Sequence, residues 1–243
     1  MTPPKIEVLA YDETPLGVLC LRRREIASRP GEFVTEVTLD HEFLMSSLYT
    51  ESERALARVG LEMVEGGESE GEGLRVMVGG LGLGYTAQAA LASARVDRVE
   101  VVELLPQVID WVESGLVPLS EELRVERADA QRLILTEGDV YGRLTGDAAP
   151  ADGERFDLIL IDVDHSPVDT LGDESIAFYT EPGLRAAAEH LAPGGVLGVW
   201  SYAESSPLAE ALRDVFEEVR VEPVTHENEL IGEEHTDWLF FAR

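Results

Sequence analysis

The chain has 243 residues, 44% of them hydrophobic, which is enough for one large domain with its own core. Its 48 acidic and 19 basic residues give a formal net charge of −29, and no basic cluster exceeds Arg22-Arg23-Arg24. Because binding to phosphates requires a basic face, this balance argues against a nucleic-acid partner. An acidic surface attracts cationic small molecules, and it is equally typical of adaptation for solubility or a salty cytoplasm.

Cysteine and histidine usage argues against a metal site. Cys20 is the single cysteine, so neither an intrachain disulfide nor a thiolate metal cluster can form within the chain. The five histidines lack His-x-x-x-His spacing, and we expect no metal. No apolar run approaches the roughly 18 residues of a membrane span, and residues 1–5 lack a signal-peptide core. We therefore expect a cytoplasmic protein with no membrane partner.

The first 73 residues differ in pattern from the rest. Three β-rich runs predict a small antiparallel region of two or three strands within residues 1–40, at Ile6–Leu9, Leu16–Leu21 and Phe33–Leu39. From Glu42 to Val64 the apolar residues take helical spacing. Glycine and glutamate dominate residues 66–73 and predict a flexible loop, so residues 41–73 are interpreted as a connector.

Strand and helix patterns alternate from residue 74 to residue 243. This alternation is typical of an α/β, doubly wound, mostly parallel Rossmann-like sheet, and predicts a nucleoside-cofactor-binding domain. Seven strands are expected, at Leu74–Val78, Val99–Val102, Arg124–Glu126, Leu158–Ile161, Gly195–Trp200, Val219–Val224 and Trp238–Ala242. Helices are expected between them, at Thr86–Ala94, Pro106–Ser114, Ala130–Thr136, Glu181–Leu191 and Pro207–Phe216. The last two strands predict an antiparallel hairpin with a long connection.

A glycine-rich turn follows the first of these strands. Gly79, Gly80, Gly82 and Gly84 separate Val78 from a helix-forming stretch. A strand, a glycine turn and a helix in this order can hold a ligand over the helix N-terminus. The spacing lacks the third glycine of the dinucleotide fingerprint and favours a nucleoside without a pyrophosphate, such as S-adenosylmethionine. The alternative is a turn that only packs the helix on the sheet.

Carboxylates follow three of the expected strands, at the sheet edge where ligands bind in such folds. Glu103 lies nineteen residues beyond Gly84, where an acid accepts hydrogen bonds from ribose hydroxyls. Asp129 is either an acceptor for an adenine amino group or the N-cap of the next helix. Asp162 is a candidate to hold a substrate amine or accept its proton. Asp164 and His165 follow it in the same loop.

Together these residues resemble the spermidine synthase (polyamine aminopropyltransferase) family within the class I methyltransferase fold. The resemblance covers nearly the whole chain and is carried by segments 11–21, 40–44, 79–84, 156–167 and 178–195, together with Glu103 and Asp129. It implies that Asp162 is the catalytic aspartate and that Asp164 or His165 stands at the family's second aspartate. It also implies that His41, the glycine loop, Glu103 and the Asp129-Ala130 pair contact the cofactor.

The resemblance leaves the donor and the reaction open. Leu81 or Leu83 stands where the family has a loop aspartate that holds the aminopropyl amine, and Asp40 replaces a tyrosine. The cofactor is therefore either decarboxylated S-adenosylmethionine or plain S-adenosylmethionine, with methylthioadenosine or S-adenosylhomocysteine as product. The expected activity is aminopropyl or other alkyl transfer to a small-molecule amine by a homodimer. The alternatives are a methyltransferase and a non-catalytic nucleoside-binding homologue.

Overall fold

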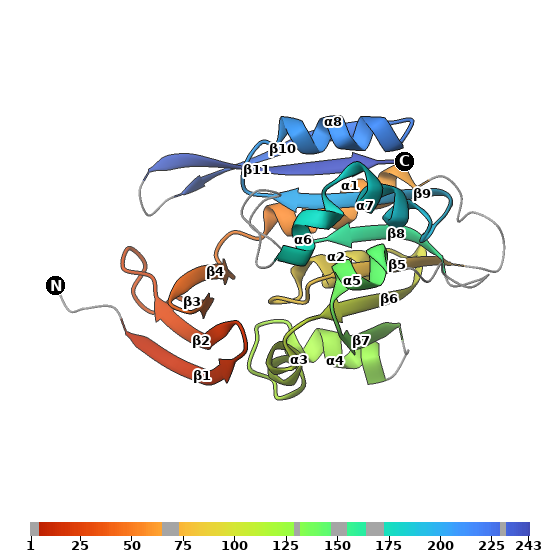
Figure 1. The fold of residues 1–243 in the computed structure, drawn as a ribbon. Coiled ribbons are helices and arrows are strands. Elements are labelled where there is room, and N and C mark those ends of the chain that lie inside the picture. The colour runs from red at the N-terminus through yellow and green to blue at the C-terminus, as the bar shows by residue number, and fades with distance from the viewer. Residues whose placement is uncertain (1–4, 65–72, 129–131, 147–154, 164–172, 229–231) are drawn as a thin grey trace.

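The computed structural model describes residues 5–64, 73–128, 132–146, 155–163, 173–228 and 232–243, and everything below refers to these residues. The chain forms two sheets, a small one at the N-terminus and a large one with helices on both faces (Figure 1). The small sheet is antiparallel, in the order β1-β2-β3-β4, with β1 at Ile6–Thr14, β2 at Gly17–Glu25, β3 at Phe33–Leu39 and β4 at Glu42–Ser46.

The large sheet has seven strands in the order β10-β11-β9-β8-β5-β6-β7. Their bounds are β5 Leu74–Gly79, β6 Val96–Glu103, β7 Leu133–Glu137, β8 Phe156–Ile161, β9 Leu191–Ser201, β10 Val219–Asn228 and β11 Glu233–Ala242. Strands β5 to β9 are parallel, and β11 is antiparallel to both β9 and β10. The expected doubly wound, mostly parallel sheet is therefore confirmed.

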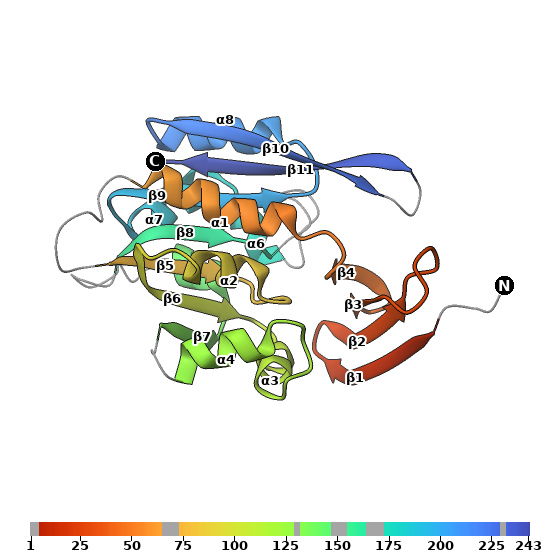
Figure 2. The ribbon, with the colours of Figure 1, turned by 180° about the vertical axis from the view of Figure 1, so that it is seen from behind.

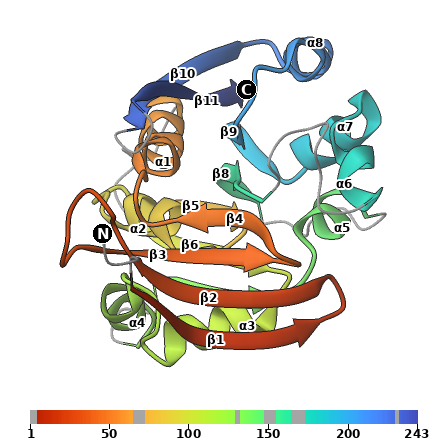
Figure 3. The ribbon, with the colours of Figure 1, turned by 90° about the vertical axis from the view of Figure 1, so that its left-hand side faces the viewer.

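Helices cover the two faces of the large sheet and give it two cores (Figure 3). The first face is covered by α1 (Glu51–Met63), α2 (Tyr85–Leu91), α3 (Pro106–Glu113) and α4 (Ser120–Ala128). The other face is covered by α5 (Val140–Thr145), α6 (Asp173–Phe178), α7 (Glu181–Ala188) and α8 (Ser206–Val215). Central strands such as β8 are buried on both sides, which explains their uninterrupted apolar sequence. None of the described helices is both long and apolar enough to cross a membrane.

The small sheet lies beside the carboxyl ends of the parallel strands (Figures 1 and 2). It has four strands, because residues 42–46 form β4 rather than the start of the expected helix. Asp40 and His41 make the two-residue turn from β3 to β4, with φ of 49° and 72°. Positive φ at both positions is the mark of a type I′ hairpin turn, and Asp and His tolerate it better than most residues. Helix α1 begins only at Glu51.

The expected positions of the third strand and the helix after it were wrong. Residues 124–126 belong to helix α4, which has acidic residues in its first turn and buries Leu123. The strand is β7, which pairs in parallel with β6 from Val99↔Leu133 to Glu103↔Glu137. The stretch at 130–136 had been expected to be a helix, but Leu133, Ile134 and Thr136 suit a half-buried edge strand better. This shift changes which carboxylate ends the third strand.

Candidate active site

The glycine loop connects the end of β5 to the start of α2, as the sequence predicts. Gly80 has φ +90°, and a Cβ there would collide with the backbone oxygen of Asp162 at the end of β8. Gly84 is the N-cap of α2 with φ +89°, and a Cβ there would meet the Leu123 side chain at 2.5 Å. The loop therefore needs glycine at these positions because two neighbouring segments approach its backbone closely.

Glu103, at the end of β6, accepts hydrogen bonds from backbone N–H groups of the glycine loop and of the segment that follows β6. It is only 8% exposed, its Oε2 accepts the N–H of Leu81 at 2.8 Å, and its Oε1 accepts the N–H of Leu105 at 2.9 Å. Burial raises the pKa of the Glu103 carboxyl, and the backbone N–H groups of Leu105, Leu81, Gly82 and Leu104 oppose that rise. A carboxylate has about four acceptor positions, and the two hydrogen bonds occupy two of them.

A first cavity of about 260 Å³ lies over these strand ends. Carboxyl groups at the carboxyl ends of three parallel strands, β6, β7 and β8, line it: Glu103, Asp139 and Asp162. The apolar walls come from both sheets and from α3, with Leu39 and Met45 from the small sheet and Trp111 from α3. The small sheet therefore completes the cavity that the large sheet begins.

Asp139, rather than Asp129, follows the third strand. Its Oδ1 and Oδ2 accept the N–H groups of Tyr141 and Gly142, each at 2.9 Å, so it is the N-cap of α5. Asp129 and Ala130 lie outside the described residues. The sequence did contain a signal for Asp139, an apolar run at residues 133–135 followed by Gly138-Asp139.

Asp162 follows β8, as expected, and its carboxylate lies beside α2. The hydroxyl of Thr86 donates a hydrogen bond of 2.6 Å to its Oδ2. Burial raises the pKa of Asp162 to about 6, a rise that the Thr86 hydrogen bond opposes and the nearby charge of Asp237 increases. Asp164 and His165 lie outside the described residues, so their roles stay predictions.

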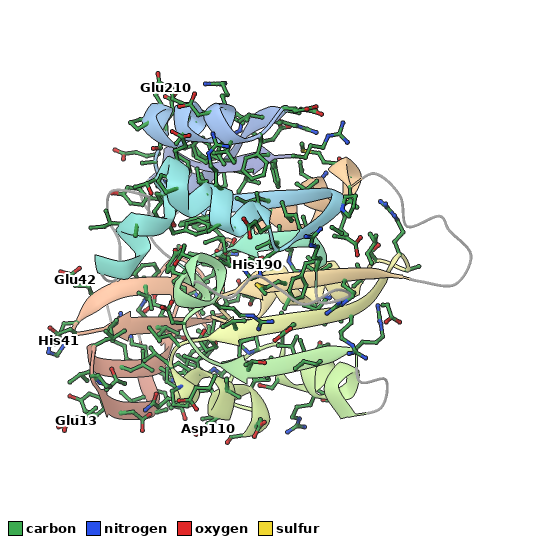
Figure 4. The ribbon with its side chains drawn as sticks, turned by 45° about the vertical axis from the view of Figure 1, so that its right-hand side comes forward. Glu13, His41, Glu42, Asp110, His190 and Glu210 are labelled. Carbon is green, nitrogen blue, oxygen red and sulfur yellow. The ribbon has the colours of Figure 1, made fainter. Side chains whose placement is uncertain are left out.

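His41 is separate from these groups. It is exposed at the tip of the β3–β4 turn and points outward (Figure 4). It lines neither cavity of the site. The contact of His41 with a cofactor therefore stays a prediction, and in this structure His41 lies away from both cavities.

A second cavity, of about 470 Å³, adjoins the first. Both are lined by Leu44, Met45, Gly82, Asp162 and Val163, so Asp162 lies where they meet. The second cavity also contains the carboxyl groups of Glu53 from α1 and Asp237 from β11. Burial, together with the charges of Asp162 and then Asp237, raises the pKa of Glu53 to about 8.

Aromatic rings and the terminal hairpin line the rest of the second cavity. His226 and His235 are directly paired across β10 and β11, with ring centroids 5.3 Å apart. His226 stacks on Tyr49 at 4.5 Å, and Nε2 of His235 lies 3.2 Å from Oδ1 of Asp237. The Trp200 indole N–H lines the same cavity, is buried, and has no hydrogen-bond partner in the described part of the chain.

The terminal hairpin is confirmed, but its strands are longer and its connection shorter than expected, since β10 continues to Asn228 and β11 begins at Glu233. This lengthening brings the two histidines and Asp237 to the cavity. Sequence reasoning missed them, and Glu53, because residues so far apart in the chain gave no local pattern. Among the residues that the structure describes, no group of three or more His, Cys, Asp or Glu side chains is arranged to hold a metal ion.

No protein-family model and no curated protein matches the sequence. Solved structures do match. A spermidine synthase in complex with the transition-state analogue AdoDATO has a TM-score of 0.67 at 17% identity, over 97% of this chain and 73% of that chain. Spermidine synthase from Thermotoga maritima has a TM-score of 0.65 at 15% identity, over 97% and 71%.

Human methyltransferase-like protein 13 in complex with SAH matches at a TM-score of 0.56 and 17% identity, over 79% of this chain and 82% of that chain. The TM-scores establish a shared fold, and in this chain a small antiparallel sheet precedes the seven-stranded one. The chain therefore has the fold shared by spermidine synthases and class I S-adenosylmethionine-dependent methyltransferases.

Proposed function

We propose that the chain is a transferase that moves an aminopropyl or other alkyl group from an S-adenosylmethionine-type sulfonium nucleoside to a small-molecule amine. The observation that carries the proposal is the position of Asp162 where two different cavities meet. The first cavity has the features of a nucleoside site and the second those of an amine site. Asp162 is in reach of both.

The first cavity fits the nucleoside of the donor. Glu103 contributes a carboxyl group for ribose hydroxyls, and Leu104, Val140 and Trp111 offer apolar walls for a base. The glycines at 80 and 82 keep the floor free of side chains, so a ligand can approach the backbone. Asp139, already the N-cap of α5, stands at the position for which Asp129 had been predicted.

The second cavity fits an amine. Its carboxyl groups attract an ammonium ion, and its rings at Tyr49, Trp200 and Tyr202 are surfaces on which aliphatic chains and cations pack well. The chemistry that the sulfonium nucleoside supplies is a carbon that bonds to the amine nitrogen while its bond to sulfur breaks, the electron pair staying on sulfur. Asp162 orients the amine and accepts the proton that the nitrogen loses.

A methyltransferase is the second candidate, and one observation favours it. Leu81 and Leu83, which stand near the position of the family's loop aspartate, are buried and line the second cavity. A loop without a carboxylate suits a donor that carries its own. In that case plain S-adenosylmethionine is the cofactor and the transferred group is methyl.

That the protein is a homodimer remains a prediction from the sequence.

Calorimetric titration tests the proposal. Methylthioadenosine, S-adenosylmethionine and its decarboxylated form are each titrated into the protein. Binding of methylthioadenosine together with one or both donors is the expected result. If none of the three nucleosides binds, the aminopropyltransferase and methyltransferase proposals are both wrong.

A further inference from the structure

The second cavity contains a carboxyl group near the glycine loop, although the loop itself has none. Glu53 lies in the first turn of α1 and lines the cavity together with loop residues Leu81, Leu83 and Gly84. The Ser52 hydroxyl donates to its Oε2 at 3.0 Å. Its backbone oxygen lies 3.3 Å from the hydroxyl of Thr86 in the first turn of α2. The start of α1 therefore packs against the helix that follows the loop.

No described cation neutralises Glu53. The guanidinium that lines this cavity belongs to Arg24, and it is 2.6 Å from Glu36, which also pairs with Arg22 at 2.9 Å. His235 lies beside Asp237. Burial raises the pKa of Glu53, and the nearby charges of Asp162 and Asp237 raise it further. A buried carboxyl with like charges around it and no cation is a favourable partner for a ligand ammonium.

The relative positions of the two cavities indicate which part of a bound donor would reach Glu53. The two cavities share Gly82 and Met45 in their lining, with Glu103 in the first and Glu53 in the second. A donor whose ribose is bound at Glu103 therefore extends its tail across the loop into the second cavity. A tail that ends in an ammonium alone meets the carboxyl groups of Glu53, Asp162 and Asp237, which attract it. A tail that also carries a carboxylate meets groups of like charge.

We infer that Glu53 is the specificity-determining residue for the donor, holding the terminal ammonium of a sulfonium nucleoside whose tail has no carboxylate. This inference rests on the proposed function. It assigns to helix α1 the role that a carboxylate in the glycine loop would otherwise have. It also favours the decarboxylated donor, because the leucines of the loop no longer imply that the cavity lacks an anion for the ammonium.

Equilibrium binding to the Glu53→Gln variant tests the inference. Wild-type protein is expected to bind decarboxylated S-adenosylmethionine at least about tenfold more tightly than S-adenosylmethionine, and Glu53→Gln is expected to lose most of that preference. Methylthioadenosine has no ammonium, so its affinity is expected to stay within about twofold of wild type and to report an intact nucleoside site. Glu62→Gln is the matched control, since Glu62 is exposed on the same helix and pairs with Arg58.

A wild-type measurement covers the case in which Glu53→Gln does not fold. At pH 7.5 a carboxyl of pKa about 8 is largely protonated, whereas Asp162, with a pKa of about 6, is largely ionised. An ammonium beside Glu53 stabilises its ionised form, so binding of the decarboxylated donor releases protons and binding of methylthioadenosine does not. Calorimetry in two buffers of different ionisation enthalpy measures this release.

The outcomes separate the inference from the proposed function. If wild type prefers S-adenosylmethionine, if Glu53→Gln weakens all nucleosides equally, or if proton release is the same for both ligands, the role of Glu53 is wrong while the transferase proposal stands. If no nucleoside binds to wild-type protein, both are wrong.

Discussion

The Thr86 hydroxyl on α2 donates a 2.6 Å hydrogen bond to Asp162 at the end of β8. The bond ties the helix that follows the glycine loop to the carboxylate proposed to accept the proton. The same hydroxyl lies 3.3 Å from the backbone oxygen of Glu53, but it has one hydrogen, and the shorter contact indicates that Asp162 receives it. Orientation and acidity of Asp162 therefore both depend on its contact with α2.

Replacing Asp162 with Asn is expected to abolish transfer while retaining nucleoside binding. The amide keeps the shape of the side chain and can still accept from Thr86, but it cannot take a proton from the amine. The expected loss in turnover is at least about 100-fold. Initial rates together with methylthioadenosine affinity measure the two effects. Near-normal turnover by the variant would remove Asp162 from its proposed role.

Replacing Thr86 with Val is expected to move the pH dependence of transfer. Since the hydroxyl lowers the pKa of Asp162 from a value raised by burial, its removal raises that pKa further above about 6. Asp162 must be ionised to act, so the acid limb of kcat/KM shifts to higher pH, by up to about one unit. Thr86→Ser retains the hydroxyl and is expected to keep the wild-type profile. A profile unchanged in Thr86→Val would exclude Asp162 as the group that titrates.

Replacing Glu103 with Gln is expected to weaken every nucleoside alike. The two backbone N–H groups of Leu81 and Leu105 donate to different oxygens of the carboxylate, and in the amide an NH2 group replaces one of these acceptors. A loss of about tenfold to a hundredfold in affinity is expected, because the loop loses its support. Glu137→Gln, at the exposed end of β7, is the control. Equal affinities in the two variants would contradict the placement of the nucleoside at Glu103.

Replacing Glu53 with Gln is expected to change how stability depends on pH. The pKa of Glu53 is about 8 in the folded protein, above its ordinary value of 4.5, so the folded state holds the proton over this range. Wild-type stability therefore falls as pH rises from about 4.5 to about 8, and the variant avoids this loss. Urea unfolding should give similar stabilities at pH 5 and a more stable variant at pH 8.5, by on the order of 4 kcal/mol. A difference that does not change with pH would show that Glu53 is not perturbed.

The sequence predicts the parts of the site that have local patterns. The strand before Gly79, the helix after Gly84 and the carboxyl groups at Glu103 and Asp162 all follow from apolar runs and the residues that end them. The error at β7 has a local cause as well. Residues 130–136 combine polar and apolar side chains in an order compatible with either a helix or an edge strand, and pairing with β6 decides between them.

Local sequence patterns could not predict the second cavity. Glu53 belongs to the first helix and Asp237 to the last strand, and both approach Asp162 only because β11 inserts beside β9 and α1 packs across the same face. The turn at Asp40-His41 was not predicted from the sequence either. Its positive φ values create β4, and β4 contributes Leu44 and Met45 to both cavities. Neither residue is a glycine, so the composition of the turn did not reveal its geometry.

Product analysis shows whether the protein transfers a group from either donor to an amine. Wild-type protein is incubated with a short aliphatic diamine and with either S-adenosylmethionine or its decarboxylated form, and the amine is examined by mass spectrometry, with Asp162→Asn as the control. We expect an amine that carries an aminopropyl group from the decarboxylated donor, formed together with methylthioadenosine and absent with the variant. An unaltered amine with both donors, under conditions in which the nucleosides bind, would contradict it.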